Sequence, residues 1–431
     1  MLVVLVGMLF LPEAVYFDAP LVPPLGKHEV ATICALVGLL VSSPRQLRQA
    51  RLGYGGDLFL LLMIPSIALT VLNNRDSIPI GPLTLAGLHM RDLLAIIVRT
   101  AVQVAVPYLA GRLIVGSSRD ARALVHTFVS LGLVYSVLMV LEMRFSPQLH
   151  RWVYGYHARA AFVQTMRWGG YRPTVFLEHG LAVALFALAA VLLSATEGRV
   201  TKWRLGLPAG WSTLYLVVVL IFCRSTGAIC LCLITLPVVL RGRPRSQLRV
   251  AILLATICVV YPGLKLAGLF PDQAIEEFTG HHLGAQRAES ITVRFDSEKR
   301  LIDHTRERLW FGWGGFGRNR LYNESGQSTI IIDGYWIIQL SSGGLLLLVC
   351  CFGLMLYPVM RAARVLRWTW NPRDRFVLAG LAVALACYVF DLLPNGMFSP
   401  APLFLAGALA RLNLELSRPE TGIEVAIQVA E

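Results

Sequence analysis

Residues 271–330 read PDQAIEEFTGHHLGAQRAESITVRFDSEKRLIDHTRERLWFGWGGFGRNRLYNESGQSTI, a mostly polar stretch inside an apolar chain. The chain has 431 residues, of which 56% are hydrophobic, and its mean hydropathy is +0.62. Apolar runs long enough to span a bilayer lie on both sides of this stretch. The sequence therefore predicts a membrane protein with one sizeable soluble element, and the side on which that element lies limits what the protein can do.

The rest of the chain is divided into apolar segments of a length suited to crossing a membrane. A transmembrane helix needs about 20 mostly apolar residues with few charges near its middle. About twelve segments meet this criterion, centred near Leu9, Val37, Pro65, Val102, Leu133, Leu185, Val217, Cys232, Ile257, Leu348, Ala384 and Ala406. We therefore expect an all-α polytopic integral membrane protein with about 12 transmembrane helices, and residues 1–431 as a single transmembrane domain. The first segment, MLVVLVGMLF, lacks the basic start of a signal peptide, so we expect it to be retained.

Basic residues are concentrated in the connectors between alternate apolar segments, and the formal net charge is +13. They are Arg45, Arg48, Arg51, Arg112, Arg119, Arg122, Arg199, Lys202, Arg204, Arg241, Arg243, Arg245, Arg249, Arg361, Arg364, Arg367, Arg373 and Arg375, with Asp57, Asp120, Glu197 and Asp374 nearby. The positive-inside rule places such connectors in the cytoplasm. Both termini are then cytoplasmic, and the large loop between the ninth and tenth helices is periplasmic. The basic charge is thus explained by membrane topology, and we expect no nucleic-acid partner.

Cysteine and histidine usage gives no reason to expect a metal or a cofactor. All eight cysteines lie within apolar segments, so the large loop has neither a disulfide framework nor a CxxC site. His281 and His282 are adjacent and lack a partner at the spacing of metal ligands. Together with His304 they are interpreted as solvated loop histidines.

Residues 144–172 form the first long outer connector, which breaks the charge rule. It contains Arg144, Arg151, Arg159, Arg167 and Arg172 and no acidic residue. Outer loops are usually poor in arginine, so this set indicates an anionic partner. The alternative is that the arginine heads reach lipid phosphates.

The same connector has the pattern of an amphipathic helix that lies in the membrane interface. Ser146 and Pro147 are a good helix start, and Gly169 and Gly170 end the run. The apolar positions recur at helical spacing, at Leu149, Val153, Tyr156, Ala160 and Val163. A basic amphipathic helix with tryptophans lies in the interface, where it would border a site for a lipid-linked anion.

Residues 267–330 are expected to form a small periplasmic cap. The cap holds eight Lys or Arg and nine Asp or Glu, and two stretches are expected to be helical, near Asp272–Phe278 and Ser290–Leu309. GWGGFG, at Gly312–Gly317, lacks the GK[ST] ending of a phosphate loop. It is interpreted as a tight turn packed on Trp310 and Trp313.

Several ionisable residues lie near the outer ends of apolar segments. Arg99 follows Asp92 by seven residues, which places it about 10 Å into its helix. The other residues of this kind are Glu142, Glu178, His179, Arg224, Asp333 and Asp391. Ionisable groups in membrane helices face a polar cavity or one another, so the set predicts a cavity open to the outside. The alternative is internal pairing, for example of Arg99 with Glu142 or Asp391.

Specific strings then resemble a known family. SPQLHRWVYGY, RWGGYRPTVFLEHGLAVAL, CRSTGAICL, SITVRFDSEKR, FGWGGFG and IIDGYWIIQLSSGG occur in that order between about Glu142 and Tyr357. Together they resemble the O-antigen ligase and polymerase superfamily, in particular its exopolysaccharide-polymerising branch. The first third of the chain and the last helices match only in hydropathy. The resemblance implies a metal-independent membrane glycosyltransferase of the bacterial inner membrane that acts on undecaprenyl-diphosphate-linked sugars at its periplasmic face.

The resemblance also implies roles for individual residues. Arg172, Arg224 and Arg294 match the family's arginines and would bind the substrate diphosphate, together with Arg99. Ligases of this superfamily carry a histidine just before the helix that follows the large loop. Asp333 stands at that position, and this difference favours chain polymerisation over transfer to a lipopolysaccharide core.

Residue chemistry agrees with these roles. Arginine holds diphosphate oxygens through bidentate, charge-assisted hydrogen bonds, and fixed cations stabilise developing charge where no metal does so. The attacking sugar hydroxyl needs a general base, for which Asp333, Glu178 and His179 are the candidates. Asp333 has an alternative role as the N-cap of the following helix, while Tyr335 and Trp336 could border a sugar.

The sequence thus predicts a polysaccharide polymerase that transfers glycan from undecaprenyl diphosphate to the hydroxyl of another lipid-linked repeat unit. An O-antigen ligase that uses a different acceptor is the alternative of the same fold. A lipid-linked sugar flippase is the alternative of another class, although no internal repeat of the kind common in transporters is visible. The expected partners are the lipid-linked oligosaccharide, the bilayer and other polysaccharide assembly proteins.

Overall fold

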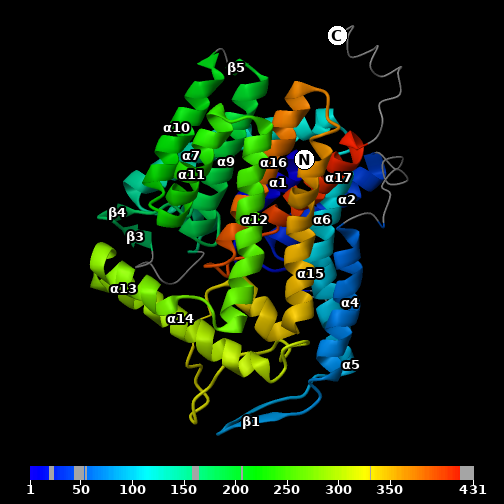
Figure 1. The fold of residues 1–431 in the computed structure, drawn as a ribbon, viewed down its shortest axis with the longest axis vertical. Helices are drawn as coiled ribbons and strands as arrows, with labels where there is room; N and C mark the ends of the chain where they lie inside the picture. Colours follow the sequence, from blue (N-terminus) through cyan, green and yellow to red (C-terminus); the bar gives the residue numbers. More distant parts are fainter. Residues whose placement is uncertain are drawn as a thin grey trace.

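The chain folds almost entirely into helices (Figure 1). The computed structural model describes residues 1–18, 24–42, 53, 56–157, 165–204, 207–330 and 332–417. Its helices are α1 (Leu2–Phe10), α2 (Lys27–Ser42), α4 (Asp57–Leu72), α5 (Met90–Thr100), the π-helical η1 (Ala101–Ala105), α6 (Val106–Ile114), α7 (Ser118–Phe145), α8 (Leu149–Tyr154), α9 (Gly180–Val200), α10 (Ala209–Phe222), α11 (Thr226–Arg241), α12 (Pro244–Ala267), α13 (Asp272–Leu283), α14 (Ala285–Arg306), α15 (Tyr335–Val365), α16 (Pro372–Asp391) and α17 (Ala401–Leu416).

Strand structure within the described ranges is confined to three short antiparallel hairpins. They pair β1 (Ile78–Ile80) with β2 (Leu83–Leu85), β3 (Met166–Arg167) with β4 (Gly170–Tyr171), and β5 (Trp203–Arg204) with β6 (Leu207–Pro208). In the first hairpin Ile78 is opposite Leu85, and in the second Met166 is opposite Tyr171. The described chain is thus mostly helical with few strands, which is consistent with the expected all-α fold class.

Five helical segments of the described chain are long and apolar enough to cross a membrane. They are Met90–Ile114, Ser118–Phe145, Gly180–Val200, Pro244–Ala267 and Tyr335–Val365. The apolar helices Asp57–Leu72, Ala209–Phe222 and Thr226–Arg241 are shorter. Each of the twelve expected segment centres lies in a helix. A membrane-embedded helical protein is thus supported, while the number of twelve spans stays a prediction.

Helices α9 and α16 form the centre of the bundle. Nearly every residue of α9 from Val183 to Glu197 is buried, as is every residue of α16 from Val377 to Val389. A helix that is apolar on all sides needs neighbours on all sides. Helix α9 obtains them from α7, α10, α11 and α16, and α16 also packs on α12, α15 and α17.

The described basic connectors gather at one end of the bundle. Three contacts join them, namely Arg112 with Asp57, Arg122 with Asp374, and Arg199 with the ring of Phe376. Figure 1 shows β5 at this end, while α13, α14 and β1 lie toward the opposite end. The sequence prediction that the connectors share one side is consistent with these contacts, whereas Arg45, Arg48 and Arg51 lie outside the described residues.

Exposed tryptophans occur near both ends of the bundle. Trp203, Trp211, Trp368 and Trp370 lie in or next to the basic connectors, and Trp152, Trp168 and Trp310 belong to connectors predicted to face the other side. Between them, helix surfaces expose large apolar side chains, among them Val137, Leu233 and Val259. Two aromatic belts around an apolar surface are typical of a protein that spans a bilayer.

The amphipathic helix expected after Ser146 is much shorter than its sequence pattern. Ser146 has a φ of 77° and caps the end of α7, so the next helix is capped by Gln148 instead. That helix, α8, has only six residues and ends at Gly155, which adopts the left-handed conformation. Ala160 and Val163 lie outside the described residues, and Gly169 and Gly170 belong to the β3–β4 hairpin rather than to a helix end.

Both helices expected in the large loop are present, as α13 and α14. Lys265, in the last turn of α12, joins them to the bundle. Its ammonium group lies 2.5 Å from Asp272 of α13 and 3.2 Å from Glu298 of α14. It also lies 3.8 Å from the ring centroid of Phe295. Because Lys265 is buried, these contacts fix the cap helices relative to the end of α12.

The glycine-rich turn after α14 pairs with a break inside α15. Gly344 has φ 71° and ψ −171°, a region open essentially only to glycine. The backbone N–H groups of Trp313 and Gly314 donate to the carbonyls of Ser341 and Ser342 at 2.9 and 2.8 Å. These N–H groups are therefore not available to a phosphate. Trp313 is buried as expected and stacks on His304 at 4.2 Å, whereas Trp310 is exposed.

Candidate functional site

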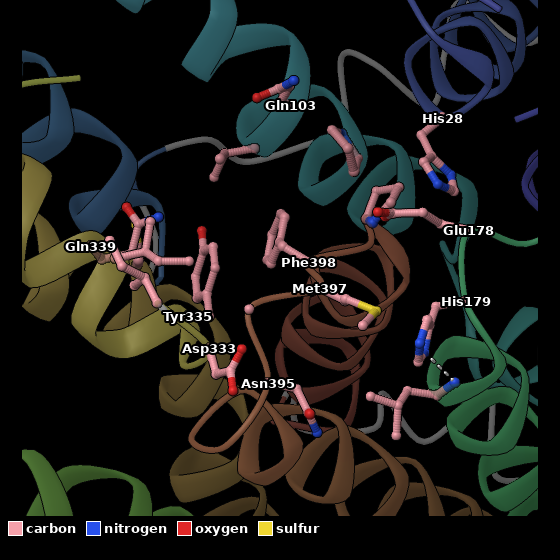
Figure 2. A pocket seen from close by; sticks show the side chains of 18 of the residues that line it. His28, Gln103, Glu178, His179, Asp333, Tyr335, Gln339, Asn395, Met397 and Phe398 are labelled. Atoms are coloured by element: carbon pink, nitrogen blue, oxygen red, sulfur yellow. Dashed lines mark hydrogen bonds between the residues drawn. The ribbon is translucent and has the colours of Figure 1, made fainter. Parts of the chain in front are cut away.

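A cavity of about 1020 Å³ lies between the starts of α2, α9 and α15, η1 and the connector from α16 to α17 (Figure 2). Ligand pockets typically have volumes of about 300–1000 Å³, so this one suits a large ligand. Five of the seven site residues predicted from sequence line it: Arg99, Glu178, His179, Arg294 and Asp333. They come from four separate parts of the chain, and the bundle brings them together. Arg172 and Arg224 are not part of its lining.

Asp333 does not cap the helix that follows it. The N-cap of α15 is Gly334, and no side chain makes a capping hydrogen bond there. The carboxylate of Asp333 instead forms an ion pair with Arg294, whose Nε lies 3.0 Å from Oδ2, and both side chains are half-exposed. Arg294 belongs to α14, so this ion pair joins the cap to the start of α15 at the cavity wall.

His179 is positioned by the start of α9. Its Nδ1 accepts a hydrogen bond from the backbone N–H of Leu181 at 3.1 Å, which makes His179 the N-cap of that helix. A neutral imidazole whose Nδ1 accepts carries its proton on Nε2. His179 is therefore better suited to donate a hydrogen bond to a ligand oxygen than to act as a general base.

Glu142 and Asp391 are engaged by groups other than Arg99. Glu142 accepts hydrogen bonds from the backbone N–H groups of Leu149, Thr174 and Val175 at 3.0, 2.8 and 2.7 Å. Asp391 accepts from the amide of Asn395 at 3.0 Å. The pairing of Arg99 with either carboxylate, which was the alternative to a cavity, is therefore wrong.

Glu142 instead holds the loop that carries the site residues. Val175 has a φ of 51°, an unfavourable value for a β-branched residue. The carboxylate of Glu142 fixes this residue and its neighbour Thr174. This loop runs from Arg172 to His179. By fixing the loop, Glu142 helps to position both of these residues.

Arg172 is a buried guanidinium without a hydrogen-bond partner. Its side chain is 1% exposed, and Nε, Nη1 and Nη2 have no partner among the described groups. Its stem lies against the first residue of α9, since a Cβ on Gly180 would lie 2.7 Å from it. Burial, and next the charge of Arg167, lower the pKa of Arg172 to about 10. It is still charged at neutral pH, and the charge of Asp391 favours this state, but no anion makes a hydrogen bond to it among the described residues.

Arg224 holds the β3–β4 hairpin in place. Its backbone adopts φ 54°, and its Nη1 donates to the carbonyls of Arg167 and Trp168. A Cβ on Gly170 would lie 2.1 Å from Nη2, so the guanidinium in its present position lies directly against this glycine. Met166 and Arg167 of the hairpin line the cavity. In this structure Arg224 therefore positions Arg167 at the site.

Several further polar residues line the cavity that were not predicted from the sequence, namely His28, Glu29, Gln103, Gln339 and Asn395. Glu29 accepts from the amide of Gln103 at 3.2 Å, which joins α2 to η1. The run Lys27-His28-Glu29 at the start of an apolar segment was an available signal. Asn395 had none, because it lies in a short connector with an ordinary turn composition.

The cavity wall carries charges of both signs. Its basic residues are Arg99, Arg167 and Arg294, and its acidic residues are Glu29, Glu178 and Asp333. A wall of this kind can hold an anion at one place and sugar hydroxyl groups at another.

Among the described residues, no group of three or more His, Cys, Asp or Glu is arranged to hold a metal ion. No protein-family model matches the chain, and no curated protein matches its sequence. The resemblance to the O-antigen ligase and polymerase superfamily therefore rests on the strings quoted above.

Proposed function

We propose that this protein is a polysaccharide polymerase of the bacterial inner membrane. It would transfer a glycan from undecaprenyl diphosphate to a sugar hydroxyl of another lipid-linked repeat unit at the periplasmic face. The proposal includes about twelve transmembrane helices, cytoplasmic termini and a periplasmic cap made by residues 267–330.

The observation that carries the proposal is the guanidinium of Arg172, which is buried and makes no hydrogen bond within the described part of the chain. A charge buried without a partner is strongly unfavourable, so a fold that keeps one is expected to gain a partner when a ligand binds. Arg167 lies close enough to lower its pKa, and the first residue of α9 lies against its stem. Two guanidinium groups beside a helix N-terminus provide the chemistry that binds a diphosphate.

The proposed reaction uses chemical groups on opposite walls of the cavity. A hydroxyl of the acceptor sugar attacks the anomeric carbon of the donor sugar, and the bond from that carbon to the diphosphate oxygen breaks. Asp333 accepts the hydroxyl proton, and the diphosphate leaves with the bonding electrons. Arg167 and Nε2–H of His179, which line the cavity, stabilise the charge that develops on the leaving group. Arg172 joins them once its guanidinium turns toward the cavity, whose lining it does not reach in this structure.

A flippase is the second candidate, because two helices that line the cavity are interrupted. The π-helical turn η1 separates α5 from α6, and α15 is broken at Gly344. Interrupted helices at a binding site are common in transporters. The cap opposes this function, since Lys265 and the Arg294–Asp333 pair tie it to the bundle.

Deletion of the gene, followed by analysis of the lipid-linked pool, separates the candidates. A polymerase mutant accumulates single repeat units on the outer leaflet of the inner membrane. A ligase mutant accumulates full-length lipid-linked chains, and a flippase mutant accumulates single units on the inner leaflet. Either of the last two results would overturn the proposal.

A further inference from the structure

Tyr335 and Phe398 form a parallel aromatic stack at the centre of the cavity. Their ring centroids lie 4.5 Å apart and their planes differ by 9°. Tyr335 is the first residue of α15, and Phe398 belongs to the connector between α16 and α17. Both line the cavity. Stacked rings of this kind are rigid and present a flat apolar face.

The backbone fixes both partners of this stack. The N–H of Tyr335 donates to the carbonyls of Leu392 and Asn395 at 2.9 and 3.2 Å, so the start of α15 is joined to the connector that carries Phe398. The ring of Phe352 lies 6.3 Å from Tyr335 and supports it from within α15. Tyr335 is buried as a result, and the wall is formed before a ligand arrives.

One face of Phe398 is covered by Tyr335, so its accessible area must come mainly from the other face. Figure 2 shows Phe398 in the middle of the cavity, with Met397, Glu178 and His179 on the side away from Tyr335. Asp333 and Asn395 lie on the same wall as Tyr335. An aromatic face beside a carboxylate and a carboxamide combines apolar contact with several hydrogen-bonding groups.

We infer that Phe398 is the platform on which the acceptor sugar stacks, so that the Tyr335–Phe398 wall selects the acceptor. This inference rests on the proposed polymerase function. A pyranose ring exposes C–H groups with partial positive charge on one face, and these suit the negative face of an aromatic ring. Its rim hydroxyl groups suit Asp333 and Asn395, which can accept and donate hydrogen bonds there.

The positions of the charges assign this wall to the acceptor and not to the donor. Asp333, which accepts the proton of the attacking hydroxyl, is two residues from Tyr335. His179, which faces the diphosphate in the proposed reaction, lies at the start of α9 on the side of Phe398 away from Tyr335 (Figure 2). Arg167 also lines the cavity, from the β3–β4 hairpin. A sugar on Phe398 therefore places its hydroxyl near the base, with the donor on the far side.

Phe398→Leu tests the platform by removing the flat face while retaining an apolar side chain. The acceptor probe is the methyl glycoside of the repeat unit, which lacks a diphosphate and can only accept. We expect the KM for this acceptor to rise about tenfold, with the KM for the lipid-linked donor and the kcat at saturating acceptor within about twofold of wild type. Phe398→Tyr, which keeps the face, should restore the acceptor KM. The control is Phe278→Leu, an exposed phenylalanine of α13, which should change neither constant.

A binding measurement that needs no turnover separates the failure of this inference from the failure of the proposed function. Saturation-transfer NMR on the purified protein with the methyl glycosides of glucose, galactose and mannose should show transfer to the C–H protons of one ring face, and Phe398→Leu should abolish it. If saturation transfer depends on Phe398 but the protein makes no polymer, the sugar-binding site is supported and the proposed polymerase function is overturned. An active polymerase whose acceptor KM and saturation transfer do not change in Phe398→Leu would overturn the platform, as would absence of transfer from all three sugars in the wild type.

Discussion

At the residue scale, Arg172 is a buried charge that a bound anion would stabilise. Its guanidinium is 1% exposed and has no described hydrogen-bond partner, and Arg167 adds repulsion. The sequence identified Arg172 as an anion-binding candidate from the absence of acidic residues around it. It did not reveal the burial, because burial depends on how the β3–β4 hairpin and the start of α9 pack over the side chain.

Arg172→Met should therefore stabilise the protein and inactivate it. Replacing buried charge with a well-packed apolar side chain is often stabilising, here by about 1 kcal/mol or more, while the diphosphate loses its guanidinium. Thermal unfolding in detergent and polymer yield measure the two effects. In Arg172→Lys the yield should also fall, because an ammonium cannot form the planar bidentate contact. Arg199→Lys is the control at the opposite end of the bundle. Loss of stability in Arg172→Met together with full activity in Arg172→Lys would contradict the assignment.

Asp333 lines the cavity and does not cap the helix that follows it. Its carboxylate pairs with Arg294 at the cavity wall, and Gly334 occupies the N-cap position. We expect Asp333→Asn to lose about 100-fold or more in transfer rate, because an amide cannot accept the proton, with little change in unfolding temperature. Asp303→Asn is a matched control, since Asp303 pairs with Arg306 on the exposed cap surface at 3.1 Å. Equal rates for Asp333→Asn and wild type would exclude Asp333 as the base.

At the element scale, helices specified by local sequence could be predicted, whereas features that depend on tertiary contacts could not. The cap helices α13 and α14 follow from local composition and were predicted. The prediction that a helix continues past Tyr154 was wrong, because Gly155 adopts a left-handed conformation and ends α8. The break at Gly344 could not be predicted, since a backbone segment from the cap has to pair with α15 to stabilise it. Phe398 and Asn395 could not be predicted as site residues for the same reason, because their connector is held at the cavity by its contacts with the start of α15.

Gly344→Ala tests this break. The backbone there has φ 71°, and a Cβ would lie 2.3 Å from the backbone of Trp310. Strained backbone costs about 1–3 kcal/mol, and the clash with backbone atoms adds to it, so we expect a loss of more than about 3 kcal/mol and poor yield of folded protein. Gly263→Ala in α12 is the control, since a Cβ there meets nothing within 4 Å. A normally folded Gly344→Ala protein would show that the cap does not depend on this pairing.

At the scale of the whole molecule, the two ends of the bundle differ in charge and in content. The described basic connectors meet at one end, and the cap lies toward the other (Figure 1). The positive-inside rule turned this asymmetry into a prediction from sequence alone. The cavity itself was predicted only as a list of residues, because its walls come from helices far apart in the chain.

Reporter fusions measure the predicted orientation. Fusions after Arg245 and Arg367 should give cytoplasmic signals, because both lie in the alternate basic connectors that the positive-inside rule places in the cytoplasm. Fusions after Gly170 and Gly312 should give periplasmic signals, because both lie in the intervening connectors. Two reversed signals among the four would overturn the orientation and the periplasmic site.

The central claim is that this cavity joins one lipid-linked glycan to another. Its most direct test is the incubation of the purified protein with undecaprenyl-diphosphate-linked repeat units, followed by separation of the products by size. We predict a ladder of longer lipid-linked glycans, one undecaprenyl diphosphate released for each transfer, and no ladder from Asp333→Asn. Repeat units that stay single with the wild-type protein, but cross the bilayer when it is reconstituted in vesicles, would contradict the claim.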